Sequence, residues 1–433
     1  GLDNSVALFL DGVYIGRQAG IQFDMFDLER VEVLKGPQGT LFGRNAIGGA
    51  INVVTSKPQN EFGAKVQATV GNEGILRYQG LVTGGLTDNL SGKFVVNHRE
   101  HDGFTRNTLL QKDVQNEDYT SFRGQLMLET DATEWLLSAD LWDDDRDDMG
   151  RAPIANGNFD YVGTATDLGA GRPGTSASPT DGYTKREGSG LSLHGDIDLA
   201  GGVITSITGF RNTETDWEMP SIGAPAGGGY DLANGVFGVD VIDDIDEEID
   251  TFSQELRWTS SAEGSFDYIL GLYFLTEDTD REEQFRLDRN TVATGQVIVG
   301  NEYTRTRNET TSYAAYGQAN WRFSDAWTLT FGGRWTRDER DYTATAVNCG
   351  LDEADRAAAG FPNFPPCEGV GGSLGIIAEV FEVSTTGSWT DFSPMASIQF
   401  KPGDNIMYFG TISTGYKSGG FAGSQGVALS LIH

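Results

Sequence analysis

The sequence of 433 residues is poor in several features, and each shortage argues against a class of protein. It has no run of 18 apolar residues, so no segment qualifies as a transmembrane helix. Its 31 lysines and arginines face 63 aspartates and glutamates, and the resulting net charge of −32 argues against a nucleic-acid partner. Proline is scarce at 12 residues whereas glycine reaches 58, a balance that fits β-structure with many bends and fits disorder poorly.

Catalytic and cofactor motifs are also missing. The four histidines show no metal-ligand spacing such as H-E-x-x-H, and the acidic runs 143–148 and 243–250 lack the spacing of an EF-hand. The glycine-rich segment 36–58, GPQGTLFGRNAIGGAINVVTSKP, contains neither the G-K-[ST] of a P-loop nor a G-x-G-x-x-G fingerprint. We therefore expect no enzyme, no cofactor and no metal site, and the glycines need another explanation.

What the sequence does contain, from about residue 62 onward, is a repeated alternation of apolar and polar residues. In one such segment Phe122, Gly124, Leu126 and Leu128 share one face, and Arg123, Gln125, Met127 and Glu129 share the other. Similar segments start near residues 252, 266, 313 and 327. A period of two over this length predicts strands with one apolar face, about thirteen in all.

The predicted connections alternate between short and long. The short ones lie near 87–89, 131–134, 200–202, 261–264, 324–326 and 402–405, and aromatic residues cluster beside most of them. The long ones are 102–118, 143–186, 218–249, 279–306 and 340–389. This asymmetry is typical of an outer-membrane barrel, whose turns are short on the periplasmic side and whose loops are long outside. A soluble sandwich is the alternative, but its dry core could not hold the polar alternate face.

Two motifs resemble one family. The segment 31–58, VEVLKGPQGTLFGRNAIGGAINVVTSKP, strongly resembles the C-terminal part of the plug domain of TonB-dependent outer-membrane receptors. The segment 412–421, ISTGYKSGGF, resembles a motif in the barrels of the same family. The matching plug positions are Gly36, Pro37, Gly39, Leu41, Gly43, Arg44, Gly48, Gly49, Ile51 and Asn52. The resemblance implies that this segment packs inside a barrel, where its glycines permit tight turns and close backbone approach.

The family also implies the fold class and the domains. We expect a mostly β protein, a transmembrane antiparallel β-barrel with a small α/β plug remnant. Residues 1–58 would form the C-terminal part of the plug and residues 59–433 the N-terminal part of the barrel. A plugged barrel of this kind has 22 strands, so about 13 strands suggest an internal fragment. Residues 429–433 resemble a translated transposon end, and whether they are protein sequence stays open.

The function implied by the resemblance is active transport across the bacterial outer membrane. The partners would be outer-membrane lipid, a small scarce ligand such as a ferric siderophore, and the TonB energising complex, whose contact segment is missing here. We expect the ligand at the long loops 143–186, 218–249, 279–306 and 340–389. A passive porin or adhesin-like barrel is an alternative, as is uptake of glycan, haem or cobalamin, because fold does not fix the ligand.

Specific side-chain pairs follow from the same resemblance. Plug cations, Arg30, Lys35 and Arg44, are expected to pair with glutamates on the lumen face of the barrel, with Glu129 and Glu255 as candidates. Arg44 with Glu255 is the favoured pair, and the alternative is that Glu255 only hydrates the lumen.

The two cysteines, Cys349 and Cys367, suggest a disulfide in an oxidising compartment, and two free thiols are the alternative.

Overall fold

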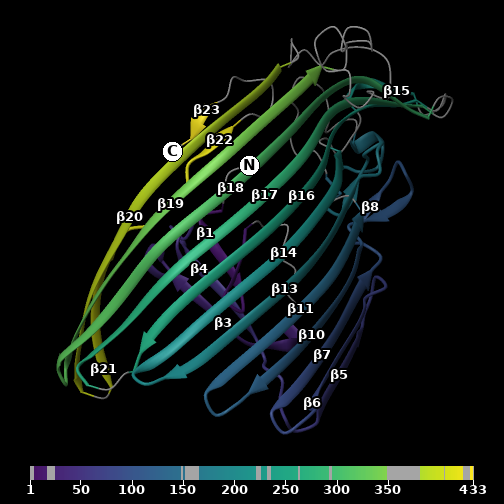
Figure 1. The fold of residues 1–433 in the computed structure, drawn as a ribbon. Coiled ribbons are helices and arrows are strands. Elements are labelled where there is room, and N and C mark those ends of the chain that lie inside the picture. The colour runs from purple at the N-terminus through teal and green to yellow at the C-terminus, as the bar shows by residue number, and fades with distance from the viewer. Residues whose placement is uncertain are drawn as a thin grey trace.

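The computed structural model describes residues 4–16, 25–147, 150–151, 165–220, 226–231, 236–261, 264–291, 295–348, 381–403, 405–422 and 430–432. Strands dominate these residues, and they form one large sheet and a small N-terminal sheet (Figure 1). No helix in this part of the chain is long and apolar enough to cross a membrane.

The N-terminal sheet has four strands in the order β2-β1-β4-β3. Its elements are β1 (Val6–Leu10), β2 (Val13–Ile15), the 3-10 helix η2 (Met25–Asp27), β3 (Leu28–Lys35), α1 (Gly39–Phe42) and β4 (Gly49–Thr55). Alternate residues of these strands point to opposite faces, and both faces are apolar. One face buries Phe9 and Tyr14 together with Leu275, which belongs to the large sheet. The N-terminal sheet is therefore packed against the large sheet.

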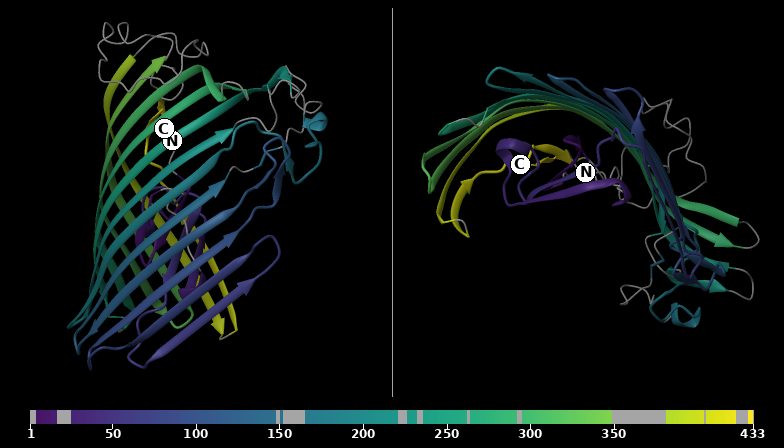
Figure 2. Two further views of the ribbon diagram at one scale, coloured as in Figure 1. Left: turned by 90° about the vertical axis from the view of Figure 1, so that its right-hand side faces the viewer. Right: turned by 90° about the horizontal axis from the view of Figure 1, so that it is seen from below.

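In the described residues the large sheet has fourteen strands, and thirteen of them pair in chain order, all antiparallel, which confirms the predicted fold class. They are β5 (Gly63–Val70), β6 (Leu76–Gly85), β7 (Leu90–His101), β10 (Glu117–Glu129), β11 (Thr133–Asp147), β13 (Tyr183–Leu199), β14 (Gly202–Pro220), β16 (Val236–Ser260), β17 (Phe266–Thr291), β18 (Gly295–Ser324), β19 (Trp327–Asn348), β20 (Phe381–Gly403) and β21 (Ile406–Ser413). Figure 2 shows that the sheet curves around the N-terminal sheet, which lies on its concave side.

Shorter strands lie outside this path. β15 (Ala226–Asp231) pairs with β16, and β8 (Thr105–Asn107), β9 (Lys112–Val114) and β12 (Thr175–Ser176) form a three-stranded sheet of their own. The last pair, β22 (Gly420–Ala422) and β23 (Ser430–Ile432), lies on the concave side near the N-terminal sheet (Figure 2).

The convex face of the large sheet carries an apolar band. On β17 the outward Leu270 and Leu272 are 53% and 59% exposed, while Leu275, which points inward, is 1% exposed. The band on this strand ends after residue 274, and Asp278 and Asp280 continue the same face. A strand needs about 9–11 residues to span the hydrocarbon core. The apolar band thus has the length of a membrane crossing, and it lies at the short-turn end of strands that are much longer.

The predicted extent of the long loops is wrong. Residues 279–306 were expected to form a loop, but β17 continues to Thr291 and β18 begins at Gly295. The connections 143–186, 218–249 and 340–389 also lose residues to the strands at both of their ends, and 102–118 loses its last two residues to β10. The regular alternation of apolar and polar residues is lost in these segments because charged and polar residues occupy both faces. The backbone ladder continues because each neighbouring strand supplies hydrogen-bond partners.

Aromatic rings line the short-turn end of the sheet. Trp327 stacks on Phe400 with ring centroids 4.4 Å apart, and Phe323 and Tyr408 extend the row on either side. Amphipathic rings favour the boundary between lipid and water. The short turns therefore lie at one membrane interface.

We predict that the apolar band tolerates no charge. Leu270→Arg should destabilise the inserted barrel by about 2–4 kcal/mol, because an arginine near the middle of a bilayer loses its hydration. Asp278→Arg, on the same strand and face but beyond the band, is the matched control and should change stability by less than about 0.5 kcal/mol. Equilibrium folding of the protein into lipid vesicles measures the stability of both variants, and equal effects would contradict the position of the band.

Candidate functional site

The glycine-rich motif folds into a compact loop that closes on itself. The Gly36 amide donates to the Gly48 carbonyl at 3.1 Å, and the Gln38 amide donates to the Ala46 carbonyl at 2.9 Å. Gly36 and Gly43 have φ values of 78° and 79°, which favour glycine. Two of the motif's backbone amides thus find their acceptors within the motif.

The two family motifs lie in contact with each other. The Asn45 amide donates to the Tyr416 carbonyl at 2.9 Å, and the Ser413 hydroxyl donates to the Pro37 carbonyl at 3.1 Å. A Cβ on Gly415 would lie only 3.1 Å from the Cα of Ile47. The two motifs are far apart in the sequence, yet they form one contact between the N-terminal sheet and the segment at the end of β21.

Beside this contact, a barrel arginine lies against the motif. Arg334 of β19 is 4% exposed, and its guanidinium lies 5.4 Å and 5.3 Å from the ring centroids of Tyr273 and Tyr316. A Cβ on Gly43 would come within 2.8 Å of the Arg334 Nη2 atom. Gly43 thus makes room for a buried cation as well as permitting the turn.

The structure places the predicted ion-pair residues as follows. Arg44 is 6% exposed, and its guanidinium lies 5.9 Å from the ring centroid of Tyr14. Glu255 accepts a hydrogen bond from the Tyr316 hydroxyl and lies 3.8 Å from Arg257. The pairing of Arg44 with Glu255 stays a prediction.

The other candidate charges lie at the surface. Arg30 forms ion pairs with Glu29 and Glu32 on its own strand, and Glu129 is exposed at the end of β10. The Asn52 amide donates to Glu32 at 3.0 Å, and this hydrogen bond together with Arg30 lowers the pKa of the Glu32 carboxyl. Lys35 is exposed as well.

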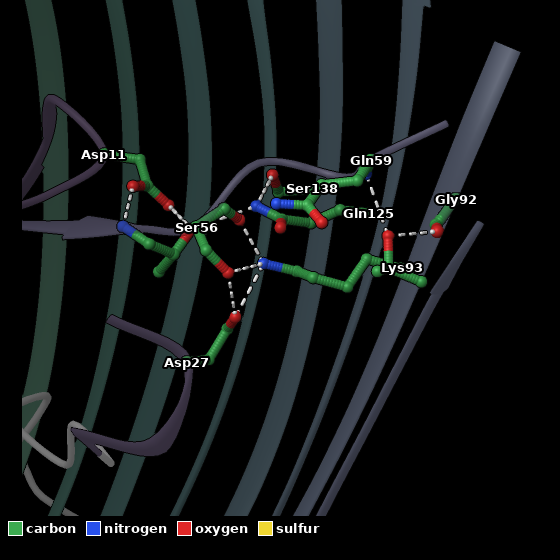
Figure 3. Close-up of polar contacts among 10 residues, drawn as sticks. Asp11, Asp27, Ser56, Gln59, Gly92, Lys93, Gln125 and Ser138 are labelled. Carbon is green, nitrogen blue, oxygen red and sulfur yellow. Dashed lines mark hydrogen bonds and ion pairs between the residues drawn. The ribbon is translucent and has the colours of Figure 1, made fainter. Parts of the chain in front are cut away.

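A buried ion pair that the sequence analysis missed joins the two sheets. Lys93 of β7 and Asp27 of η2 are 2.7 Å apart, and their side chains are 1% and 6% exposed (Figure 3). The Lys93 ammonium also donates to the hydroxyl and the carbonyl of Ser56. The sequence does indicate that Lys93 faces the lumen, because it occupies a polar position in a segment where apolar and polar residues alternate. The sequence does not identify its partner.

Further hydrogen bonds extend this pair along the interface (Figure 3). The Gln125 amide donates to the hydroxyls of Thr55 and Ser138, at 3.1 Å and 2.9 Å. Asp11 accepts from the backbone and the side chain of Thr55 at 2.7 Å and 2.9 Å. We name the set Asp11, Asp27, Thr55, Ser56, Lys93, Gln125 and Ser138 the polar anchor. Its function is mechanical: it fixes the N-terminal sheet to the inside of the large sheet.

Several predicted site residues lie outside the described part of the chain. Cys349 and Cys367 are among them, so their disulfide stays a prediction, as does ligand binding by the long loops. Among the described residues, no group of histidine, cysteine, aspartate and glutamate has the geometry to hold a metal ion.

We predict that the polar anchor depends on its ion pair. Lys93→Met leaves the Asp27 carboxylate buried without a cation and should cost about 3–5 kcal/mol. Lys57→Met is the control, because Lys57 pairs with Glu134 at the exposed surface and should contribute at most about 1 kcal/mol. Unfolding of the protein in denaturant, monitored by protease cleavage of the N-terminal sheet, measures the loss of stability in both variants. Equal losses of stability in the two variants would show that the buried ion pair contributes no more than the exposed one.

We also predict that Gly43 is more sensitive to a side chain than Gly36. Both have a positive φ, so alanine is strained at either position, but a Cβ on Gly36 meets no atom within 4 Å. Gly43→Ala additionally displaces Arg334 and should destabilise the protein by at least about 1 kcal/mol more than Gly36→Ala. Thermal unfolding of the two variants compares them, and similar losses would mean that Arg334 moves aside freely.

Comparison with known proteins agrees with this geometry. The family described as "TonB dependent receptor-like, beta-barrel" matches residues 132–428, and the "TonB-dependent Receptor Plug Domain" matches residues 1–50. The catecholate siderophore receptor Fiu of Escherichia coli strain K12 is 40% identical over 73 residues, which are 17% of this chain and 9% of Fiu. The vitamin B12 transporter BtuB of Photobacterium profundum is 28% identical over 156 residues, 34% of this chain and 25% of BtuB.

Solved structures share the fold over nearly the whole chain. The ferric yersiniabactin uptake receptor FyuA from Yersinia pestis superposes with a TM-score of 0.75 at 18% identity, covering 99% of this chain and 58% of FyuA. The chain thus spans a little over half of that receptor. Because the barrel family matches most of the sequence and the plug family matches the segment held by the polar anchor, the chain belongs to the TonB-dependent receptors of the outer membrane.

Proposed function

We propose that this chain is part of a receptor that captures a scarce small ligand outside the cell and moves it inward past the plug. The ligand is a ferric siderophore or a similar compound, and the TonB complex supplies the energy. We place the boundary between plug and barrel near residue 58, in the connection between β4 and β5. The long-loop end of the barrel is extracellular in this proposal, and the short turns are periplasmic.

The observation that carries the proposal is a plug that occupies the concave side of the barrel (Figure 2) and is fixed there by the buried pair of Lys93 and Asp27. A passive pore needs no such unit, so the plug favours gated transport over the porin alternative. The named relatives bind catecholate siderophores, ferric yersiniabactin or vitamin B12, and the first two support iron uptake.

An aromatic patch on the lumen side supports an aromatic ligand. Tyr342, Trp389 and Phe421 lie together, with ring centroids 5.7 Å apart between Phe421 and each of the others. Trp389 has the same parity on β20 as Ser393, which contacts Thr40 of the plug at 3.5 Å. Four residues of strand separate the two, so the patch lies about 13 Å beyond the plug contact toward the long loops. A ligand entering from that side meets the patch before it meets the plug.

We predict that ligand affinity depends on this patch. Trp389→Ala should weaken binding of a ferric catecholate about tenfold, or 1.4 kcal/mol, because it removes a stacking surface. Trp335→Ala is the control: Trp335 lies on the neighbouring strand, faces lipid at 43% exposure, and should change affinity less than about twofold. Binding titrations and uptake of labelled iron by cells that lack other receptors provide the measurement.

Two results would count against the proposal. Uptake of labelled cobalamin, with no binding of ferric siderophores, would show that the receptor resembles the vitamin B12 transporter BtuB in its ligand. Uptake that continues without the TonB complex would favour the passive pore.

A further inference from the structure

A small cavity lies next to the polar anchor, between the plug and the wall of the barrel. Its volume is ≈ 50 Å³, and its lining comes from η2, β1, β3 and β4 of the plug and from β7, β10, β11 and β14 of the barrel. Most of the lining on the plug side is apolar: Leu10, Phe26, Leu28 and Val53. Asp27 lies among these residues, so the ion pair with Lys93 borders the cavity.

Asn97 of β7 lines this cavity from the opposite side. It is 1% exposed, and within the described part of the chain neither its Nδ2 nor its Oδ1 atom has a hydrogen-bond partner. The same holds for the Oδ2 atom of Asp27, because the ion pair with Lys93 uses Oδ1. Polar atoms that are buried without hydrogen bonds are costly. Both residues therefore call for a partner inside the cavity.

Arg123 of β10 brings a charge to the same cavity. It lies opposite Asp140 in the register of β10 and β11, but the Asp140 carboxylate accepts two hydrogen bonds from Arg211, at 3.0 Å and 3.3 Å. Gly190 lies between Asp140 and Arg211 and leaves room for this pair, since a Cβ there would come within 2.5 Å of the Arg211 Nη1 atom. Asp140 is thus held by Arg211, and Arg123 borders the cavity beside it.

The polar groups around the cavity require an occupant that both donates and accepts hydrogen bonds. Asn97 Nδ2 and the Arg123 guanidinium are donors, whereas Asn97 Oδ1 and Asp27 Oδ2 are acceptors. An anion would meet the Asp27 carboxylate, and a cation would meet the Arg123 guanidinium. Water suits both kinds of group, and a cavity of this volume has room for about three to five waters at roughly 10–15 Å³ each.

We propose that this cavity binds a cluster of water molecules that connects Asp27 of the plug to Arg123 of the barrel, with Asn97 holding the cluster in place. A bridging water is nearly as favourable as a direct hydrogen bond. The polar anchor then has a second cation, which Asp27 reaches through water, beside its direct pair with Lys93. The site depends on the contact between plug and barrel and not on which ligand the receptor transports.

The first test asks whether the cavity holds water. Radiolytic hydroxyl-radical footprinting of the complete receptor labels buried side chains that lie beside bound water. Phe26 lines the cavity, and Phe9 is the matched control, because it is as buried, at 7% against 8% exposure, but packs in an apolar cluster with Tyr14 and Leu275. We expect Phe26 to be labelled at least about fivefold faster than Phe9, because apolar interiors stay dry. Equal labelling would overturn the site.

The second test measures the link between Asp27 and Arg123 by a double-mutant cycle with Asp27→Asn and Arg123→Met. We expect the two effects on the unfolding equilibrium constant of the complete receptor to be coupled by at least about threefold. Arg257→Met is the matched control, because Arg257 lies on β16, on the same face as Glu255 and away from the cavity. Its coupling to Asp27→Asn should be less than about twofold, as for distant residues.

Variants of Asn97 distinguish a link through water from a direct one. Asn97→Leu fills the cavity with an apolar side chain and should reduce the coupling between Asp27 and Arg123 to less than about twofold. Asn97→Ser keeps a hydroxyl and leaves room for water, so the coupling should persist. An absence of coupling in the unmodified background would overturn the proposal. So would coupling that survives Asn97→Leu, because Asp27 and Arg123 would then interact without water.

Discussion

A membrane barrel that turns its apolar side chains outward must turn polar side chains inward, because successive residues of a strand alternate between faces. Inward polar groups then need partners in a confined and partly dry space. The plug supplies them. Lys93 would be a buried, unpaired ammonium without Asp27, and Gln125 would lose one of its acceptors without Thr55. In this barrel the plug therefore provides partners for polar side chains that the same alternation turns away from lipid.

The two attachment regions of the plug differ in their chemistry. The polar anchor relies on one buried ion pair and on hydroxyl and amide contacts, which have defined directions. The glycine-rich motif relies on backbone approach: Asn45 reaches the Tyr416 carbonyl, and Gly43 leaves space for Arg334. A loop without side chains at these positions can lie against a barrel wall that carries large ones. The two regions attach the plug by different contacts, backbone approach in one and side-chain pairing in the other, and this difference explains why the motif is rich in glycine and the polar anchor is not.

Much of this arrangement could be predicted from the sequence. The alternation in 122–129 assigned Gln125 and Met127 to the inside, and they are 2% and 3% exposed, whereas Leu126 is 43% exposed. The extent of the strands beyond the membrane could not be predicted, because segments such as 279–291 are polar on both faces and show no period. The polar anchor was missed for a different reason. A lysine on a lumen face has many possible partners, and only the docking of the plug selects Asp27.

The sequence by itself determined the class of the protein: a period of two with an apolar face requires lipid or a core on one side, and the order of glycines in 36–49 is specific to a plug. Only the tertiary structure decided which charges are paired, which glycines are crowded and which are open. Gly43 and Gly124 look alike in the sequence, yet one lies against Arg334 and the other faces empty space. The difference lies in what surrounds each residue, because strand periodicity fixes the direction of a side chain, whereas its neighbours depend on how separate segments pack together.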